Sequence, residues 1–69
     1  MVTYYIHKFD EPDGLAHHEI DMFELEVEDD DKARAIVRES YGQRDDLYLF
    51  KLTGVKDHRG LLLKIGISL

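Results

Sequence analysis

The residues of this sequence that could bind a metal ion or take part in catalysis include its histidines and its runs of acidic side chains. His17 and His18 precede Glu19 and Asp21, and all four side chains can bind a metal ion. In a strand, however, consecutive residues point to opposite faces, so His17 and His18 would not bind one ion together. The sequence has neither cysteine nor the HExxH spacing, and we therefore expect no metal site.

The acidic run at residues 28–31 has a structural explanation. It lacks the ligand spacing of an EF-hand loop. Aspartate side chains accept hydrogen bonds from the free N–H groups in the first turn of a helix, and their charge suits that end of the helix dipole. We therefore expect this run to begin a helix and not to bind Ca²⁺ or Mg²⁺.

Nucleophilic catalysis has little support in the sequence. A nucleophile needs an adjacent base, and the only serines, Ser40 and Ser68, lie outside any glycine-rich turn. The GxGxxG and Walker motifs are absent. A chain of 69 residues also leaves little room for a ligand pocket. We expect a non-enzymatic protein with no catalytic residue and no cofactor.

Length and charge indicate one compact domain that spans residues 1–69. The formal net charge is -6, and most of the acidic residues fall within residues 1–31. Such a chain repels nucleic acid, because phosphate binding needs clustered Lys and Arg side chains. We recognise neither a secretory signal nor an apolar run long enough to span a membrane. We expect a cytoplasmic protein that binds neither nucleic acid nor membrane.

Hydrophobic periodicity predicts four strands and one helix. The strands are expected at residues 2–9, 19–28, 47–53 and 61–69. Pro12 and Gly14 predict a turn after the first strand. Apolar residues then recur at helical spacing, at Ala33, Ile36, Val37 and Tyr41. Gly42 follows them as a natural helix end.

The resulting order is ββαββ, an α+β fold in which one helix packs on one face of a four-stranded sheet. The first and last strands are the most apolar. This favours a β-grasp-like order, with those two strands parallel at the centre of the sheet. The alternative is an antiparallel sheet with another strand order under the same helix.

One face of this sheet would be left without a helix. We expect Tyr48, Phe50 and Leu52 to face the helix. On the opposite face we expect Leu47, Leu49 and Leu62, with Tyr5, His7, Lys51 and Lys64 beside them. An apolar patch of this kind exceeds what a small monomer normally exposes, and it predicts an interface with another protein or with a second copy.

Glu24, Glu26 and Glu28 alternate with apolar residues and would form an outward row on an edge strand. Alternate residues on a strand lie about 6.6 Å apart, a distance of the same order as the phosphate spacing of nucleic acid. The leading hypothesis is a small acidic interaction module whose partner is a basic protein or a second copy. The alternative is a nucleic-acid-mimicking inhibitor of a basic DNA- or RNA-binding protein. A metal- or ligand-binding accessory domain is the weaker alternative.

Overall fold

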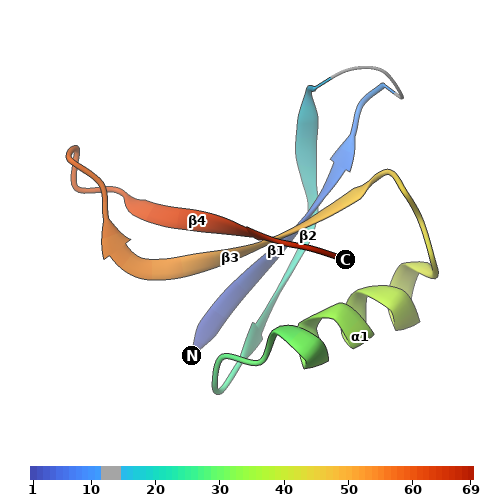
Figure 1. The fold of residues 1–69 in the computed structure, drawn as a ribbon, viewed down its shortest axis with the longest axis horizontal. Coiled ribbons are helices and arrows are strands. Elements are labelled where there is room, and N and C mark those ends of the chain that lie inside the picture. Colours follow the sequence, from blue (N-terminus) through green and yellow to red (C-terminus); the bar gives the residue numbers. More distant parts are fainter. Residues whose placement is uncertain (12–14) are drawn as a thin grey trace.

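The chain folds into one antiparallel sheet and one helix in a computed structural model that describes residues 1–11 and 15–69 (Figure 1). The elements are β1 (Val2–Phe9), β2 (His17–Leu25), α1 (Asp30–Tyr41), β3 (Leu47–Lys56) and β4 (Leu62–Ile67). This confirms an α+β fold with four strands and one helix. The turn predicted at Pro12 and Gly14 lies outside the described residues.

The strand order is β2-β1-β3-β4, and every neighbouring pair is antiparallel. The predicted β-grasp-like order is therefore wrong, because β1 lies beside β3 and β4 is an edge strand. The connection through α1 carries the chain from β2 to β3 on the far side of β1. A short turn then returns the chain as β4 along the outer side of β3, which leaves β4 with one neighbouring strand among the described residues.

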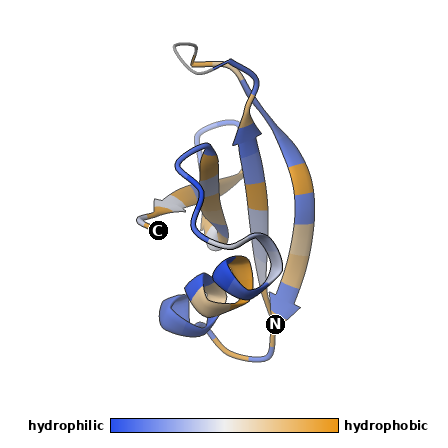
Figure 2. Ribbon diagram, turned by 90° about the vertical axis from the view of Figure 1, so that its right-hand side faces the viewer, coloured by the Kyte–Doolittle hydropathy of each residue, from blue (hydrophilic) through white to orange (hydrophobic). Residues whose placement is uncertain are grey.

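The core lies between α1 and one face of the sheet (Figure 2). Its buried side chains are Tyr4, Ile6, Ala33, Val37, Leu47, Leu49 and Ile67. Strand pairing places them on one face, since Leu49 lies opposite both Ile6 and Ile67. Ala33 and Val37 come from the predicted apolar stripe of the helix, and both are buried against the sheet.

The predicted orientation of β3 is wrong by one residue. Leu47 and Leu49 are 5% and 0% exposed beneath the helix, whereas Tyr48 is 43% exposed on the opposite face. Both faces of β3 are apolar, so alternation alone does not distinguish them. Leu47 and Leu49 pack beneath α1 together with the Tyr4 ring, and the rings of Tyr48 and Phe50 take the face without a helix.

The helix begins and ends as its sequence predicts. Asp29 is the N-cap, and its carboxylate accepts a hydrogen bond from the Lys32 backbone N–H at 3.0 Å. Gly42 has φ of 73°, and its N–H donates to the Arg38 carbonyl at 2.8 Å. Within α1, the side that carries Ala33 and Val37 is buried, which holds the short helix on the sheet.

Candidate interaction surface

Aromatic side chains from three strands meet on the helix-free face of the sheet. We call His7, Phe9, His17, Tyr48 and Phe50 the aromatic cluster. Ring centroids are 4.4 Å apart for Phe9 and Tyr48, and 4.9 Å apart for His7 and Phe50. Strand pairing produces these contacts, because His7 lies opposite Tyr48 and Phe9 lies opposite His17. Such cross-strand aromatic pairs stabilise a sheet without help from a helix.

The aromatic cluster is accessible to a partner. Tyr48 and His17 are exposed, and the other three rings are half-buried. Beside the cluster, the Lys64 ammonium lies 4.3 Å from the centre of the Tyr5 ring. This contact is a cation–π interaction, and it shows that rings on this face attract a positive charge.

Two histidines of the cluster share a hydrogen bond. The Nδ1 atoms of His7 and His17 are 2.9 Å apart, so one ring must donate a proton and the other must accept it. Burial lowers the pKa of His7, and the neighbouring His17 lowers it further. The Nε2 atom of His7 is buried and finds no hydrogen-bond partner among the described residues. His7 is therefore neutral near pH 7.

The two consecutive histidines separate as strand geometry predicts. His17 joins the aromatic cluster, and the ring of His18 contacts the carboxylate of Asp10 instead. In the described part of the chain, no three His, Asp or Glu side chains converge in a way that could hold a metal ion.

The predicted apolar interface residues take different positions. Leu47 and Leu49 are core residues and cannot contact a partner. Leu62 is 44% exposed and shares the helix-free face with Lys64, two residues along β4. His7 and Tyr5 also lie on the helix-free face, as expected. The alternation of Tyr5, His7 and Phe9 along β1 is a sequence signal for this surface.

The predicted acidic row is not continuous. Strand β2 ends at Leu25, so strand alternation does not extend to Glu26 and Glu28. Glu24 lies opposite Thr3 on the helix-free face, and Glu26 is exposed beyond the strand. The Glu28 carboxylate instead accepts a hydrogen bond from the Lys51 ammonium. The three glutamates therefore do not present one evenly spaced surface.

Lys51 is on the helix side and not on the helix-free face. Its ammonium also donates to the Asp30 carboxylate, at 3.2 and 3.3 Å. The Tyr4 hydroxyl donates to Asp30 at 3.2 Å and accepts from the Asp29 N–H at 3.1 Å. The bond to Glu28 raises the pKa of Lys51, and burial raises the pKa of Tyr4. These contacts fasten the start of α1 to β1 and β3.

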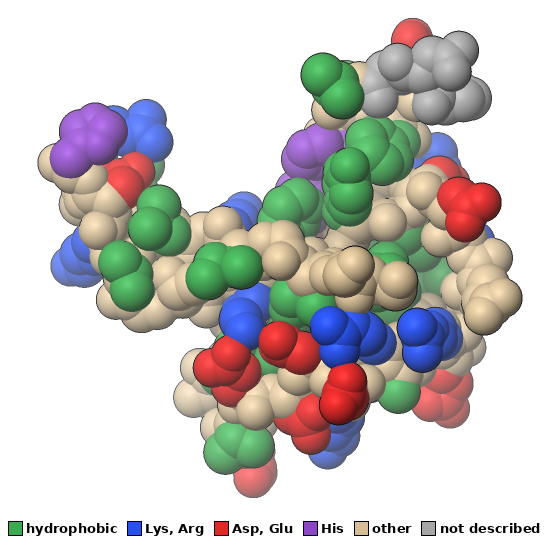
Figure 3. Space-filling model, in the orientation of Figure 1, with side chains coloured by type: hydrophobic (Ala, Val, Ile, Leu, Met, Phe, Trp, Pro, Cys, Tyr) green, Lys and Arg blue, Asp and Glu red, His purple; other side chains and the backbone are tan. Residues whose placement is uncertain are grey.

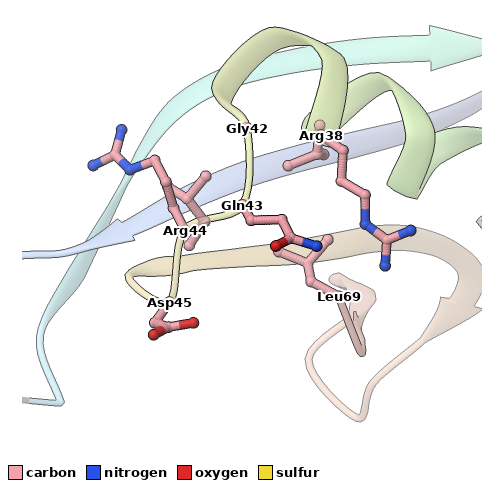
Figure 4. A pocket seen from close by; sticks show the side chains of 8 residues that line it. Arg38, Gly42, Gln43, Arg44, Asp45 and Leu69 are labelled. Atoms are coloured by element: carbon pink, nitrogen blue, oxygen red, sulfur yellow. The ribbon is translucent and has the colours of Figure 1, made fainter.

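A pocket of about 300 Å³ lies between the end of α1 and the last residue of the chain (Figure 4). The labelled guanidinium groups of Arg38 and Arg44 point to opposite sides and do not converge. Arg44 donates to Asp46, which raises the pKa of the guanidinium and lowers that of the carboxyl. The pocket therefore offers no set of convergent polar groups that would bind a small ligand.

No known family, curated protein or solved structure matches this chain in our comparisons. None of the helices in the described residues is long and apolar enough to cross a membrane.

Proposed function

We propose that this protein is a small, non-enzymatic, cytoplasmic interaction module that binds a basic protein through its helix-free face. The observation that carries this proposal is the aromatic cluster. Its five rings lie on a face that α1 does not cover. Aromatic side chains are enriched at the centres of protein interfaces, where they supply large contact areas at small entropic cost.

The surroundings of the aromatic cluster favour a basic partner. Glu19 lies opposite His7, and Glu24 lies opposite Thr3, so both carboxylates belong to the same face as the cluster. The whole chain has a net charge of -6. Rings attract Lys and Arg through cation–π contacts, and the acidic strand β2 adds longer-range attraction.

A titration with a defined basic probe tests this proposal. We expect hexa-arginine to shift the NMR signals of His17, Tyr48 and Phe50, and hexaglutamate to leave them unchanged. The shifts should weaken at high salt, because screening reduces the attraction between exposed charges. Shifts confined to the acidic start of α1 would contradict a role for the helix-free face.

A pair of variants then links the face to binding of a natural partner. We expect Tyr48→Ala to reduce recovery of basic proteins in affinity purification from the native host, while Val27→Ala does not. Val27 is 71% exposed but lies outside the strands and away from the aromatic cluster. Equal recovery by both variants would overturn the assignment of the face. The nucleic-acid-mimic alternative has less support, because the acidic row on which it depends is interrupted.

A further inference from the structure

The outer edge of the sheet at β4 is both unpaired and apolar. β4 ends the strand order, so the backbone groups along its outer side face no other strand among the described residues. Aliphatic side chains on and beside this strand are exposed to about half of their surface. They are Val55, Leu61, Leu62, Leu63 and Ile65. An exposed apolar edge strand is a template for pairing with another strand.

The β3–β4 hairpin extends away from the helix, so α1 does not shield this edge (Figure 1). Figure 3 shows hydrophobic side chains spread along this hairpin up to its charged tip, and a second group of acidic and basic side chains over α1. Leu63 and Ile65 have the same strand parity as the core residue Ile67, yet both remain exposed. The hairpin therefore exposes aliphatic side chains that lie on the helix side of the sheet but outside the hydrophobic core.

The opposite edge, β2, has protection that β4 lacks. β2 carries Glu19, Asp21 and Glu24, and its register with β1 shifts by a bulge at Ile20. Charges and bulges both discourage pairing with a further strand. The only charged residue of β4 is Lys64, and its ammonium lies over the Tyr5 ring on the helix-free face. Lys64 therefore places no charge at the outer edge of β4 that would discourage pairing with another strand.

We propose that β4 pairs antiparallel with β4 of a second copy, which joins the two sheets into one continuous sheet of eight strands. The exposed aliphatic side chains of β4 supply apolar area toward the about 800 Å² that each partner buries in a stable dimer. The newly paired backbone and the flanking residues add to this area. Because β4 has no acidic residue and carries only aliphatic side chains on the face of Leu63, Ile65 and Ile67, a second β4 is complementary to it.

Charge restricts the register of this pairing. A two-fold axis perpendicular to the sheet places one residue of β4 opposite its own copy. If that residue were Lys64, two ammonium groups would lie side by side and repel each other. With Leu63 or Ile65 at the axis, aliphatic side chains meet, and Lys64 lies opposite Leu62 or Gly66. The pairing is therefore centred on Leu63 or Ile65.

The symmetry has a consequence for the proposed function. With the axis perpendicular to the sheet, both helices lie on one side and both aromatic clusters lie on the other. The dimer would then present two binding faces in one plane and could hold a partner bivalently. This consequence rests on the proposed function, whereas the β4 pairing does not.

Sedimentation at protein concentrations from micromolar to millimolar tests the dimer directly. We expect the wild-type protein to dimerise and Ile65→Lys to weaken dimerisation by about tenfold or more, since two buried ammonium groups would be introduced. Ile65 is 51% exposed, so the variant should keep the circular dichroism spectrum of the folded chain. Val27→Lys places the same charge on an exposed aliphatic position elsewhere, and it should leave dimerisation unchanged.

Single-cysteine variants test the register, since the natural sequence has no cysteine. Leu63→Cys or Ile65→Cys should form an intermolecular disulfide under mild oxidation, because residues at the axis have suitable Cα separations.

A wild-type protein that stays monomeric, or a dimer unaffected by Ile65→Lys, would overturn the proposal. A dimer lost in Tyr48→Ala but kept in Ile65→Lys would assign self-association to the helix-free face instead. Failure of hexa-arginine binding alone would leave the β4 pairing standing and would reject only the proposed function.

Discussion

The two faces of the sheet differ in how their apolar side chains are shielded from water. Under α1, the buried side chains packed with Ala33 and Val37 are mostly aliphatic, with one ring among them: Ile6, Leu47, Leu49, Ile67 and Tyr4. On the helix-free face, rings contact one another across strands and remain partly exposed. Aliphatic side chains need a covering layer to leave water, whereas flat rings cover part of each other's surface. Residues beneath α1 therefore hold the fold together, and residues on the helix-free face are available to a partner.

The largest expected effect comes from the helix side. Leu49→Ala should lower the free energy of unfolding by about 3 kcal/mol, because it leaves a cavity at a fully buried position. Leu62→Ala, the same change at an exposed position, should cost less than about 1 kcal/mol. Urea denaturation measures both values. Equal costs would contradict the assignment of the two faces.

A smaller effect is expected from the polar contacts that fasten α1. Tyr4→Phe removes the hydroxyl that donates to Asp30 and accepts from the Asp29 N–H. We expect a loss of about 1–2 kcal/mol in thermal or chemical denaturation. Tyr5→Phe on the helix-free face is the matched control, and it should cost less than about 0.5 kcal/mol, since its ring keeps the Lys64 contact. If Tyr4→Phe left the free energy of unfolding unchanged, the hydroxyl would not help to hold the helix on the sheet.

Tyr48→Ala should separate stability from binding. Because the ring is partly exposed, its loss should cost only about 1 kcal/mol of unfolding free energy. The affinity for hexa-arginine, measured by isothermal titration calorimetry, should fall by about tenfold or more. If Tyr48→Ala destabilised the fold as strongly as Leu49→Ala, the helix-free face would be part of the core.

The smallest effect is a pH dependence from His7. Its pKa is lowered in the folded protein, so between the folded pKa and about 6.5 the unfolded chain binds more protons. The free energy of unfolding should therefore fall as pH drops below about 6.5. His7→Phe should flatten this slope, and His58→Gln, at the exposed turn of the β3–β4 hairpin, should not. Measurements above about pH 4.5 avoid the carboxylates Asp46 and Asp57, whose lowered pKa values affect stability in more acidic solution.

Local features of the fold were predictable because short-range physics decides them. The N-cap at Asp29, the end of the helix at Gly42 and the existence of four strands follow from hydrogen-bonding capacity, backbone conformation and periodicity. The candidate surface was predictable only in part. Its location on the helix-free face was expected, and His7, Tyr5 and Leu62 were placed there. Its aromatic members from β3 were assigned to the wrong face.

The sequence by itself determined an acidic α+β chain with one amphipathic helix, its caps, and an apolar last strand. The sequence also predicted the glutamate-bearing strand β2 at one edge, and only the tertiary structure decided which face of β3 meets the helix and which strand stands at the other edge. Both faces of β3 are apolar, so only the packing of α1 against one of them distinguishes the two. The position of β4 depends on the path of the chain over β1 between β2 and β3. Neither long-range relation is encoded by periodicity, which records only how neighbouring residues alternate.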